Sequence, residues 1–281
     1  MKSLDKIVET LLINGSLLET SGLFHGKTGI AIYFFHYARH TGNDLFVDYA
    51  MDLIEDVQNQ INSVKYHVRY DTGLAGIGCG FEYILQNGFL EADNSDIFED
   101  FDDRMFRATM YEPYPNFSLE SGLTGWGRYF IYRISGNLHK NFKLHEALSH
   151  IAEEISKKIL EHAIPETEQP DVYRFLCDLS TLPGYSFKYD NSLRLCRQWK
   201  NIFVPNLQNI FPYMSDLLRL YSCQKYFNID LSVEIRKEWE NWKDSFCYPL
   251  ADMGLLSGWA NDGLMYLTFI NNDNVSWMNL L

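Results

Sequence analysis

Four stretches of the sequence share one pattern and decide the fold: SGLFHGKTGIAIYFF (21–35), YDTGLAGIGCGFEYIL (70–85), LESGLTGWGRYFIYRI (119–134) and MGLLSGWANDGLMYL (253–267). In each, a small or polar residue leads into a glycine-rich turn, and a run of apolar residues typical of a buried helix follows. A pattern that recurs at a regular interval indicates a repeat architecture. The chain is therefore predicted to consist of copies of one helical unit.

The intervals between the copies give their number. One glycine of each copy serves for the alignment: Gly26, Gly73, Gly122 and Gly258. The first two intervals are 47 and 49 residues, and the last is 136, close to three of the shorter ones. Two further copies without a glycine turn should therefore lie between, and residues 170–179 and 204–222 are the candidates.

Each unit continues into a second, longer helix. In residues 43–64 apolar side chains recur every three or four residues, which is typical of a helix with one buried face. Similar helices are expected at 95–110, 140–163, 187–200 and 228–245. The glycine-led helices are apolar on nearly all sides and should be the inner ones.

Six inner and six outer helices predict an all-α protein with an (α/α)6 toroid fold. A helix at residues 4–15 can pair with the last inner helix and so close the ring. Strand signals are weak, and residues 1–281 are expected to form a single domain.

Composition and charge limit the possible functions. Of the 281 residues, 46% are hydrophobic and 22% charged, which indicates a globular protein with a large core. The net charge of −13 disfavours nucleic acid and anionic membranes as partners and favours a basic peptide. The five cysteines are widely spaced, and no signal peptide opens the sequence, so we expect reduced thiols in a cytoplasmic protein.

The turns before the inner helices are the candidate functional site. In such a ring they share one end, where free N–H groups and the positive ends of helix dipoles face the central cavity. Thr72, Ser121 and Ser257 belong to the residue types that cap helices, which is their alternative role. His25 is a poor cap and is therefore a functional candidate. The other residues of interest at these turns are Asp71, Glu120, Asp171, Trp259 and Asp262.

The turns GLFHGKTG and YDTGLAG resemble those of the lanthionine synthetase C-like (LanC-like) family, and runs such as HYARHTGNDLFVDYA look like its Bacteroidetes-type members. The resemblance covers most of the chain and implies the α/α toroid. It also implies that His25 matches a family histidine that acts as an acid or a base, and that Asp71 matches the aspartate of the family's Tyr-Asp turn. These two are the candidate catalytic residues, although their order along the chain is reversed relative to the catalytic enzymes.

The zinc ligands of the catalytic family members are missing. In those enzymes zinc activates a peptide thiol for addition to dehydrated Ser and Thr, and its ligands lie in a Cys-x-Gly turn and a Cys-His-Gly turn. This sequence has no Cys-His pair, and its late turn reads Leu256-Ser257-Gly258. We therefore expect no metal and no cofactor. A zinc-dependent cyclase would require the scattered cysteines to converge.

Three interpretations of the function stay open. The first is a zinc-less, non-cyclising LanC-like protein, a pseudoenzyme that binds a peptide substrate or leader peptide beside other enzymes of a ribosomal peptide pathway. The second is a carbohydrate-active toroid enzyme, with two carboxylates as general acid and base and tryptophans that stack on sugars. The third is a purely structural subunit. The candidate binding residues are Glu120, Trp126, Trp259 and Asp262, and the carboxylates for a catalytic pair are Asp71, Glu120, Asp171 and Asp262.

Overall fold

The computed structural model describes residues 4–63, 66–91, 94–136, 141–203, 214–243, 252–271 and 275–281. Every regular element within these ranges is helical, so the chain is all-α, as predicted. In chain order the elements are α1 (Leu4–Asn14), η1 (Gly15–Leu17), α2 (Lys27–Thr41), α3 (Leu45–Ser63), α4 (Leu74–Gln86), α5 (Asn94–Tyr111), α6 (Leu123–Gly136), α7 (Phe142–Leu160), α8 (Gln169–Ser180), α9 (Asp190–Cys196), α10 (Lys200–Phe203), α11 (Asp216–Phe227), α12 (Ser232–Trp242), α13 (Trp259–Asn271) and η2 (Val275–Leu280).

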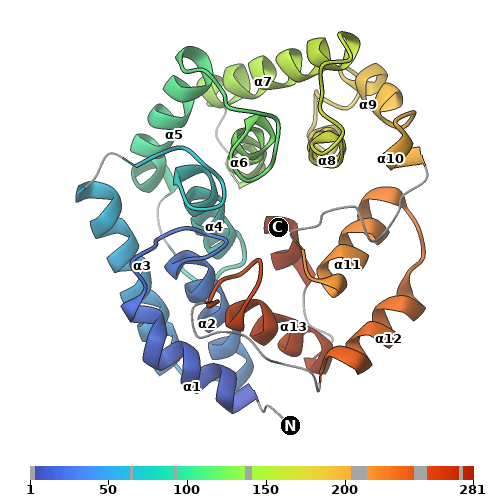
Figure 1. Cartoon of the computed structure of the whole chain (residues 1–281). Helices are drawn as coiled ribbons and strands as arrows, with labels where there is room; N and C mark the ends of the chain where they lie inside the picture. The colour runs from blue at the N-terminus through green and yellow to red at the C-terminus, as the bar shows by residue number, and fades with distance from the viewer. Residues whose placement is uncertain are drawn as a thin grey trace.

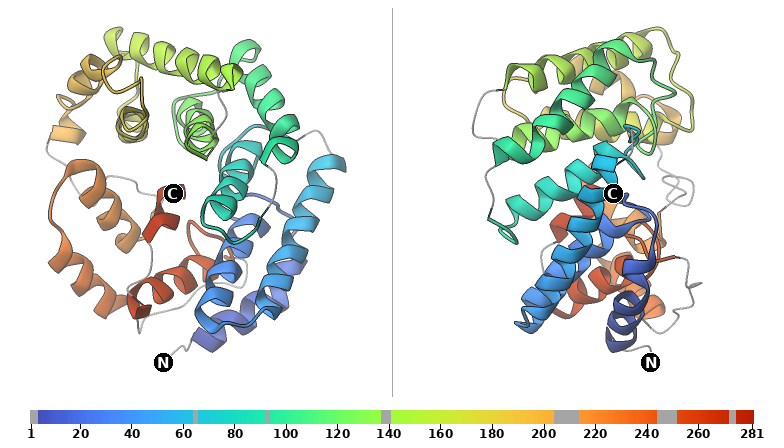
Figure 2. Two further views of the ribbon diagram at one scale, coloured as in Figure 1. Left: turned by 180° about the vertical axis from the view of Figure 1, so that it is seen from behind. Right: turned by 90° about the vertical axis from the view of Figure 1, so that its left-hand side faces the viewer.

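The helices lie in a ring with an inner and an outer layer (Figures 1 and 2). Helices α2, α4, α6, α8, α11 and α13 lie toward the centre. Helices α1, α3, α5, α7, α9, α10 and α12 lie outside them. The first helix packs against the last inner helix, α13, as the sequence predicted. None of the helices in the described ranges is long and apolar enough to cross a bilayer.

Most of the predicted helices are present. The predicted helices at 43–64, 95–110, 140–163 and 228–245 correspond to α3, α5, α7 and α12, whereas the one at 187–200 is divided into α9 and α10. The candidate inner copy at 170–179 is α8. The other candidate, 204–222, meets α11 in its last part, and its residues 204–213 lie outside the described residues.

The residue directly before each inner helix defines a common register, and we call it the repeat start. The six repeat starts are Gly26, Gly73, Gly122, Glu168, Ser215 and Gly258. They follow one another at intervals of 47, 49, 46, 47 and 43 residues. The two units without a glycine turn therefore keep the spacing of the others. Gly73, and not Thr72, is the N-cap of α4, so the capping role considered for Thr72 is wrong.

A glycine three residues after the repeat start lets the turn fold back onto its own helix. A Cβ atom on Gly29, Gly76 or Gly125 would overlap the carbonyl oxygen six residues earlier in the chain. In the last unit Asn261 stands at this step, and its side-chain amide donates to the equivalent carbonyl, that of Leu255, at 2.9 Å. The turn thus requires either no side chain or one that hydrogen-bonds to this oxygen.

A second glycine, five residues after the repeat start, brings neighbouring inner helices together. It faces an aromatic ring that stands seven residues after the next repeat start, and a Cβ atom would overlap that ring. The pairs are Gly78 with Tyr129, Gly127 with Phe175 and Gly263 with Tyr33. The last pair joins α13 to α2, the two ends of the row of inner helices.

Candidate functional site

The turns before the inner helices hydrogen-bond to one another in order. The amide of Leu256 donates to the carbonyl of Phe24 at 3.2 Å, and the amide of Phe24 donates to the carbonyl of Asp71 at 3.0 Å. The amide of Asp71 donates in turn to the carbonyl of Glu120 at 3.1 Å. These four turns therefore share one end of the ring, as expected from the sequence. We call this end the mouth.

Side chains continue this connection where the glycine turn is absent. The carboxylate of Asp171 accepts from the amide of Leu119 at 2.9 Å, and that of Glu168 accepts from the amide of Phe117 at 2.8 Å. Asp171 lies in α8 and Glu168 is its repeat start, whereas Leu119 and Phe117 lie in the turn before α6. Asp171, a candidate catalytic carboxylate, is thus engaged in holding α8 in place.

The carboxylate of Asp71 is bound from several sides. Arg69 donates to both of its oxygens, with Nε at 2.8 Å from Oδ1, and the amide of Thr72 donates to Oδ1 at 2.8 Å. Burial by itself raises the pKa of Asp71, but the hydrogen bonds and charge of Arg69, together with Thr72, outweigh it and hold the pKa below its usual value. Asp71 is therefore ionised at neutral pH and a weak base.

The neighbouring acid, Glu120, has the opposite electrostatic character. Burial raises the pKa of its carboxyl, and the negative charges of Asp71 and Asp171 raise it further. The charges of Arg69 and His25 offset part of this effect. The structure thus brings together these five side chains, which we call the mouth cluster: His25, Arg69, Asp71, Glu120 and Asp171. His25 is exposed to solvent.

The other candidate binding residues are covered. Trp126 is 3% exposed, Trp259 is 4% exposed and Asp262 is fully buried. Rings covered to this extent offer no open face on which a sugar could stack. The indole N–H of Trp126 has no hydrogen-bond partner among the described residues.

A second set of polar side chains faces the interior of the ring, and the sequence analysis missed it. The residue ten positions after the repeat start is polar in all six units: His36, Tyr83, Tyr132, Asp178, Lys225 and Thr268. One helical turn earlier stand Ile32, Cys79, Arg128, Arg174, Tyr221 and Leu264. Residues four apart share one face of a helix, so we call these twelve residues the interior row.

Contacts between neighbouring units run along the interior row. A ring nitrogen of His36 lies 2.8 Å from the hydroxyl of Tyr83. Arg128 donates to Asp178 at 2.8 Å, and Lys225 donates to the same carboxylate at 3.3 Å. Burial raises the pKa of Asp178, but the charges of Arg128, Lys225 and Arg174 outweigh it and lower the pKa. Hydrogen bonds of the row therefore connect α2 with α4, and α6 with α8 and α11.

The interior also contains the end of the chain. Segment 275–281, which consists of η2 and Leu281, lies at the centre of the ring in Figure 1, where the C label stands. Three of its side chains, those of Trp277, Leu280 and Leu281, belong to residues at most 1% exposed. The interior is thus filled by a stretch of polypeptide in addition to the side chains of the inner helices.

Side chains from five inner helices bind this segment. Tyr83 of α4 lies 3.0 Å from the Ser276 hydroxyl, Thr268 of α13 accepts from the Trp277 indole at 3.0 Å, and Lys225 of α11 donates to the Asn279 side chain at 2.9 Å. At its end, Arg128 of α6 donates at 2.8 Å to the main-chain oxygen of Leu281, to which Arg174 of α8 also donates. All five donors and acceptors on the helices belong to the interior row.

The two arginines carried a signal that the sequence analysis overlooked. Arg128 and Arg174 each stand six residues after a repeat start, in consecutive units and in apolar helices. They are 4% and 2% exposed. A buried charge is costly unless it is paired. Two arginines at the same step of neighbouring apolar helices therefore indicate that polar partners lie on that face, and this reasoning could have identified the interior.

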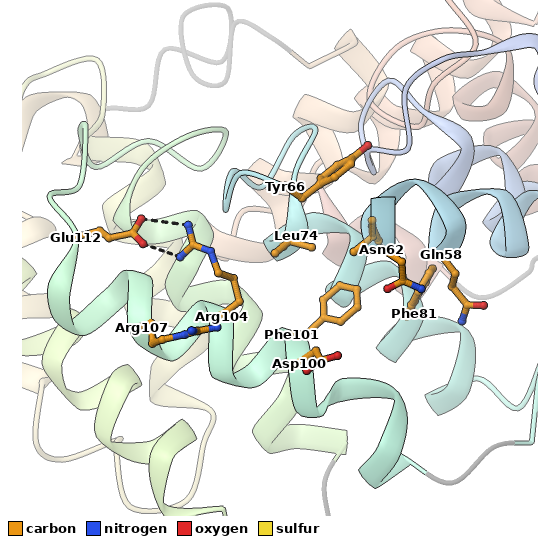
Figure 3. A pocket seen from close by; sticks show the side chains of 11 residues that line it. Gln58, Asn62, Tyr66, Leu74, Phe81, Asp100, Phe101, Arg104, Arg107 and Glu112 are labelled. Carbon is orange, nitrogen blue, oxygen red and sulfur yellow. Dashed lines mark hydrogen bonds and ion pairs between the residues drawn. The ribbon is translucent and has the colours of Figure 1, made fainter. Parts of the chain in front are cut away.

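A pocket of about 730 Å³ lies on the outer side, between α3 and α5 (Figure 3). Leu74, Phe81 and Phe101 line it with apolar surface. Arg104 forms two hydrogen bonds with Glu112 at its edge, at 2.8 and 3.2 Å. None of the residues that the sequence singled out lines this pocket, so it does not share a site with the mouth cluster.

The described residues contain no group of three or more His, Cys, Asp and Glu side chains arranged to hold a metal ion. Cys79, Cys177, Cys196 and Cys223 are unbridged thiols, and Cys247 lies outside the described residues. Burial raises the pKa of Cys177 and Cys223 to about 11, which leaves both thiols protonated at neutral pH.

No family model, no curated protein and no solved structure matches this chain. The function is therefore inferred from the residues and their arrangement.

Proposed function

We propose that this chain is a zinc-less, non-cyclising relative of the LanC-like proteins with an (α/α)6 toroid fold, and that it binds a peptide inside the ring. The regular spacing of the six repeat starts and the two layers of helices support the toroid. The observation that carries the function is the interior row, which already binds a stretch of polypeptide through side chains of five helices.

The chemistry of the interior suits a peptide. Arg128 and Tyr70 donate to main-chain oxygens, at 2.8 Å each, and such bonds form with a peptide of any sequence. Buried apolar side chains then distinguish one sequence from another. The net charge of −13 attracts a basic peptide at long range. A peptide substrate or a leader peptide of a modification pathway fits both properties, with other enzymes of that pathway as partners.

A selection of displayed random peptides against the full chain tests this proposal. Peptides that bind in the ring should lose affinity by about fivefold when Lys225 becomes Gln, because the variant removes one partly exposed charge worth about 1 kcal/mol. Lys188→Gln is the matched control. Both lysines bind a carboxylate and lie over a tyrosine ring, but Lys188 pairs with Glu153 on the outer surface.

Two results would overturn peptide binding in the ring. One is a selection in which no peptide is enriched over an unrelated acidic protein. The other is a set of selected peptides whose affinity changes equally with Lys188→Gln and with Lys225→Gln, since the peptides would then respond to the overall charge and not to the interior.

One observation favours the carbohydrate-active alternative. Asp71 and Glu120 lie at the same mouth with pKa values shifted in opposite directions, which is the pattern of a catalytic base and acid. The bonds of Arg69 and Thr72 to Asp71 oppose it, because they occupy the lone pairs that a base must offer. Turnover of an oligosaccharide by the wild type that Glu120→Gln abolishes would establish this alternative, and a broad panel without turnover would remove it.

A further inference from the structure

Segment 275–281 is bound in the way a short peptide is bound to a receptor. Polar side chains of the interior row meet its polar groups one by one, from Ser276 to Leu281. Its apolar side chains are buried between them, with Trp277 and Leu280 at 0% exposure. Polar contacts along the main chain combined with apolar pockets are the usual basis of peptide recognition.

The strongest of these contacts are at the end of the segment. Arg128 and Arg174 approach the main-chain oxygen of Leu281 together, and the hydroxyl of Tyr70 donates to the oxygen of Leu280 at 2.8 Å. Hydrogen bonds from charged donors are stronger than neutral ones, and burial strengthens them further. A guanidinium also presents its donors in a fixed plane, which suits a peptide oxygen.

We propose that the ring interior is a site for short peptides that contain an apolar pair of residues, held at a main-chain oxygen by Arg128 and Arg174, and that segment 275–281 occupies this site as a tethered competitor. This proposal rests on the peptide-binding function proposed above. A tether gives the segment an effective concentration on the order of millimolar. A peptide from solution must therefore displace the segment, so only peptides that bind the site tightly enough to compete with it are bound by the full chain.

Removal of residues 275–281 tests the proposal directly. The probe is a synthetic peptide of the segment's sequence, VSWMNLL, with fluorescein at its N-terminus, and fluorescence anisotropy gives its dissociation constant. The shortened chain should bind the probe at least about tenfold more tightly than the full chain, because no tethered segment competes. The scrambled peptide LNLMWSV has the same composition and should bind the shortened chain at least about tenfold more weakly than the probe.

Equal binding of the probe to the two chains would overturn the proposal, and so would equal binding of the probe and the scrambled peptide. Far-ultraviolet circular dichroism and a thermal melt establish that the shortened chain is folded. The segment buries three large side chains, so its removal could unfold the ring.

Hydrogen exchange of the full chain decides that case. A displaceable segment must open without the rest of the fold, so the amides of residues 276–281 should exchange at least about tenfold faster than those of α6 and α8. If all of them exchange at one rate, the segment opens only with the whole ring and is a structural element, which overturns the proposal.

The two proposals fail in different ways. If peptides selected on the full chain bind the full and shortened chains equally, the segment is no competitor, while peptide binding stands. If the folded shortened chain binds neither the probe nor any selected peptide, both proposals are wrong.

Discussion

The mouth cluster and the interior row both pair an arginine with an aspartate, but in different surroundings. At the mouth, the side chain of Arg69 is 44% exposed and that of Asp71 is 11% exposed. In the interior, the side chain of Arg128 is 4% exposed and that of Asp178 is 18% exposed. The two aspartates are covered to a similar extent, so the pairs differ in the arginine, which water reaches at the mouth but not in the interior. The charge of Arg128 must therefore have partners, whereas that of Arg69 can be solvated.

Replacement of each arginine by methionine should give the largest contrast. Arg128→Met removes one buried donor from the Asp178 carboxylate, which keeps Lys225, and one from the Leu281 oxygen, which keeps Arg174. We expect the free energy of unfolding to fall by about 3 kcal/mol, because two hydrogen bonds from a buried charge are lost. Arg69→Met leaves Asp71 with water and Thr72, at a loss of up to about 1 kcal/mol. Urea unfolding of the two variants measures both values. Equal losses would show that the two environments do not differ in energy.

The mouth depends more on its main-chain turns than on its charges, and two glycines of α4 show why. Gly76 faces the main-chain carbonyl of Tyr70, whereas Gly80 faces the side-chain methyl group of Thr28, a buried residue whose hydroxyl donates to the carbonyl of Ser21. We expect Gly76→Ala to cost about 3 kcal/mol by overpacking against fixed main chain. Gly80→Ala should cost less, about 1–2 kcal/mol, because one side chain must shift instead of fixed main chain and the better helix propensity of alanine offsets part of the strain. If the two variants have the same melting temperature, the close approach of the Tyr70 carbonyl is not the reason that position 76 requires glycine.

The same contrast explains which units were recognisable from the sequence. Units that begin with Gly26, Gly73, Gly122 and Gly258 share a turn that tolerates no side chain, and that restriction leaves a pattern. The unit of α8 replaces the glycine by Glu168, whose carboxylate holds the neighbouring turn. Because a glutamate makes the contact that a glycine turn makes elsewhere, the sequence of this unit does not resemble the others. Only its spacing from the neighbouring units indicated it.

The candidate functional residues also fall into a group that the sequence could place and a group that it could not. The turn residues His25, Asp71 and Glu120 could be placed at one mouth because they stand beside the glycines. The interior row required a register that becomes visible only when each helix start is known, since Arg128 and Arg174 lie inside apolar runs. Segment 275–281 carries no motif, and its position depends on contacts with residues up to 210 positions away in the sequence.

A third prediction compares the mouth and the interior by their effect on peptide affinity, and the expected effect is smaller. His25 is exposed at the mouth, so His25→Ala should leave the melting temperature nearly unchanged. It should weaken a selected peptide by about twofold, the effect of a residue at the rim of a site. Anisotropy titrations measure this against the larger loss expected for Lys225→Gln. An unchanged affinity removes His25 from the binding site and confines recognition to the interior.

The smallest effect is a pH dependence of opposite sign for two acids of the mouth cluster. The pKa of Asp71 is lowered in the folded state, so its carboxylate stabilises the fold above the unfolded pKa of about 3.9, and this contribution is lost as the pH falls through the folded pKa. Asp71→Asn should therefore be less stable than the wild type at pH 7. The difference should shrink as the pH falls below about 4.

For Glu120 the sign is reversed. Its pKa is raised in the folded state, so its contribution is complete below the unfolded pKa of about 4.3 and is lost as the pH rises through the folded value. Glu120→Gln should thus be more stable than the wild type at pH 7, and the gain should disappear near pH 4. Asp71 is 8% exposed and Glu120 is half-buried, and both lie at the solvent-facing mouth, so each difference should stay below about 1 kcal/mol. Urea unfolding from pH 3 to 8 would contradict this interpretation if both variants followed the same curve, because the two acids would then not differ in their surroundings.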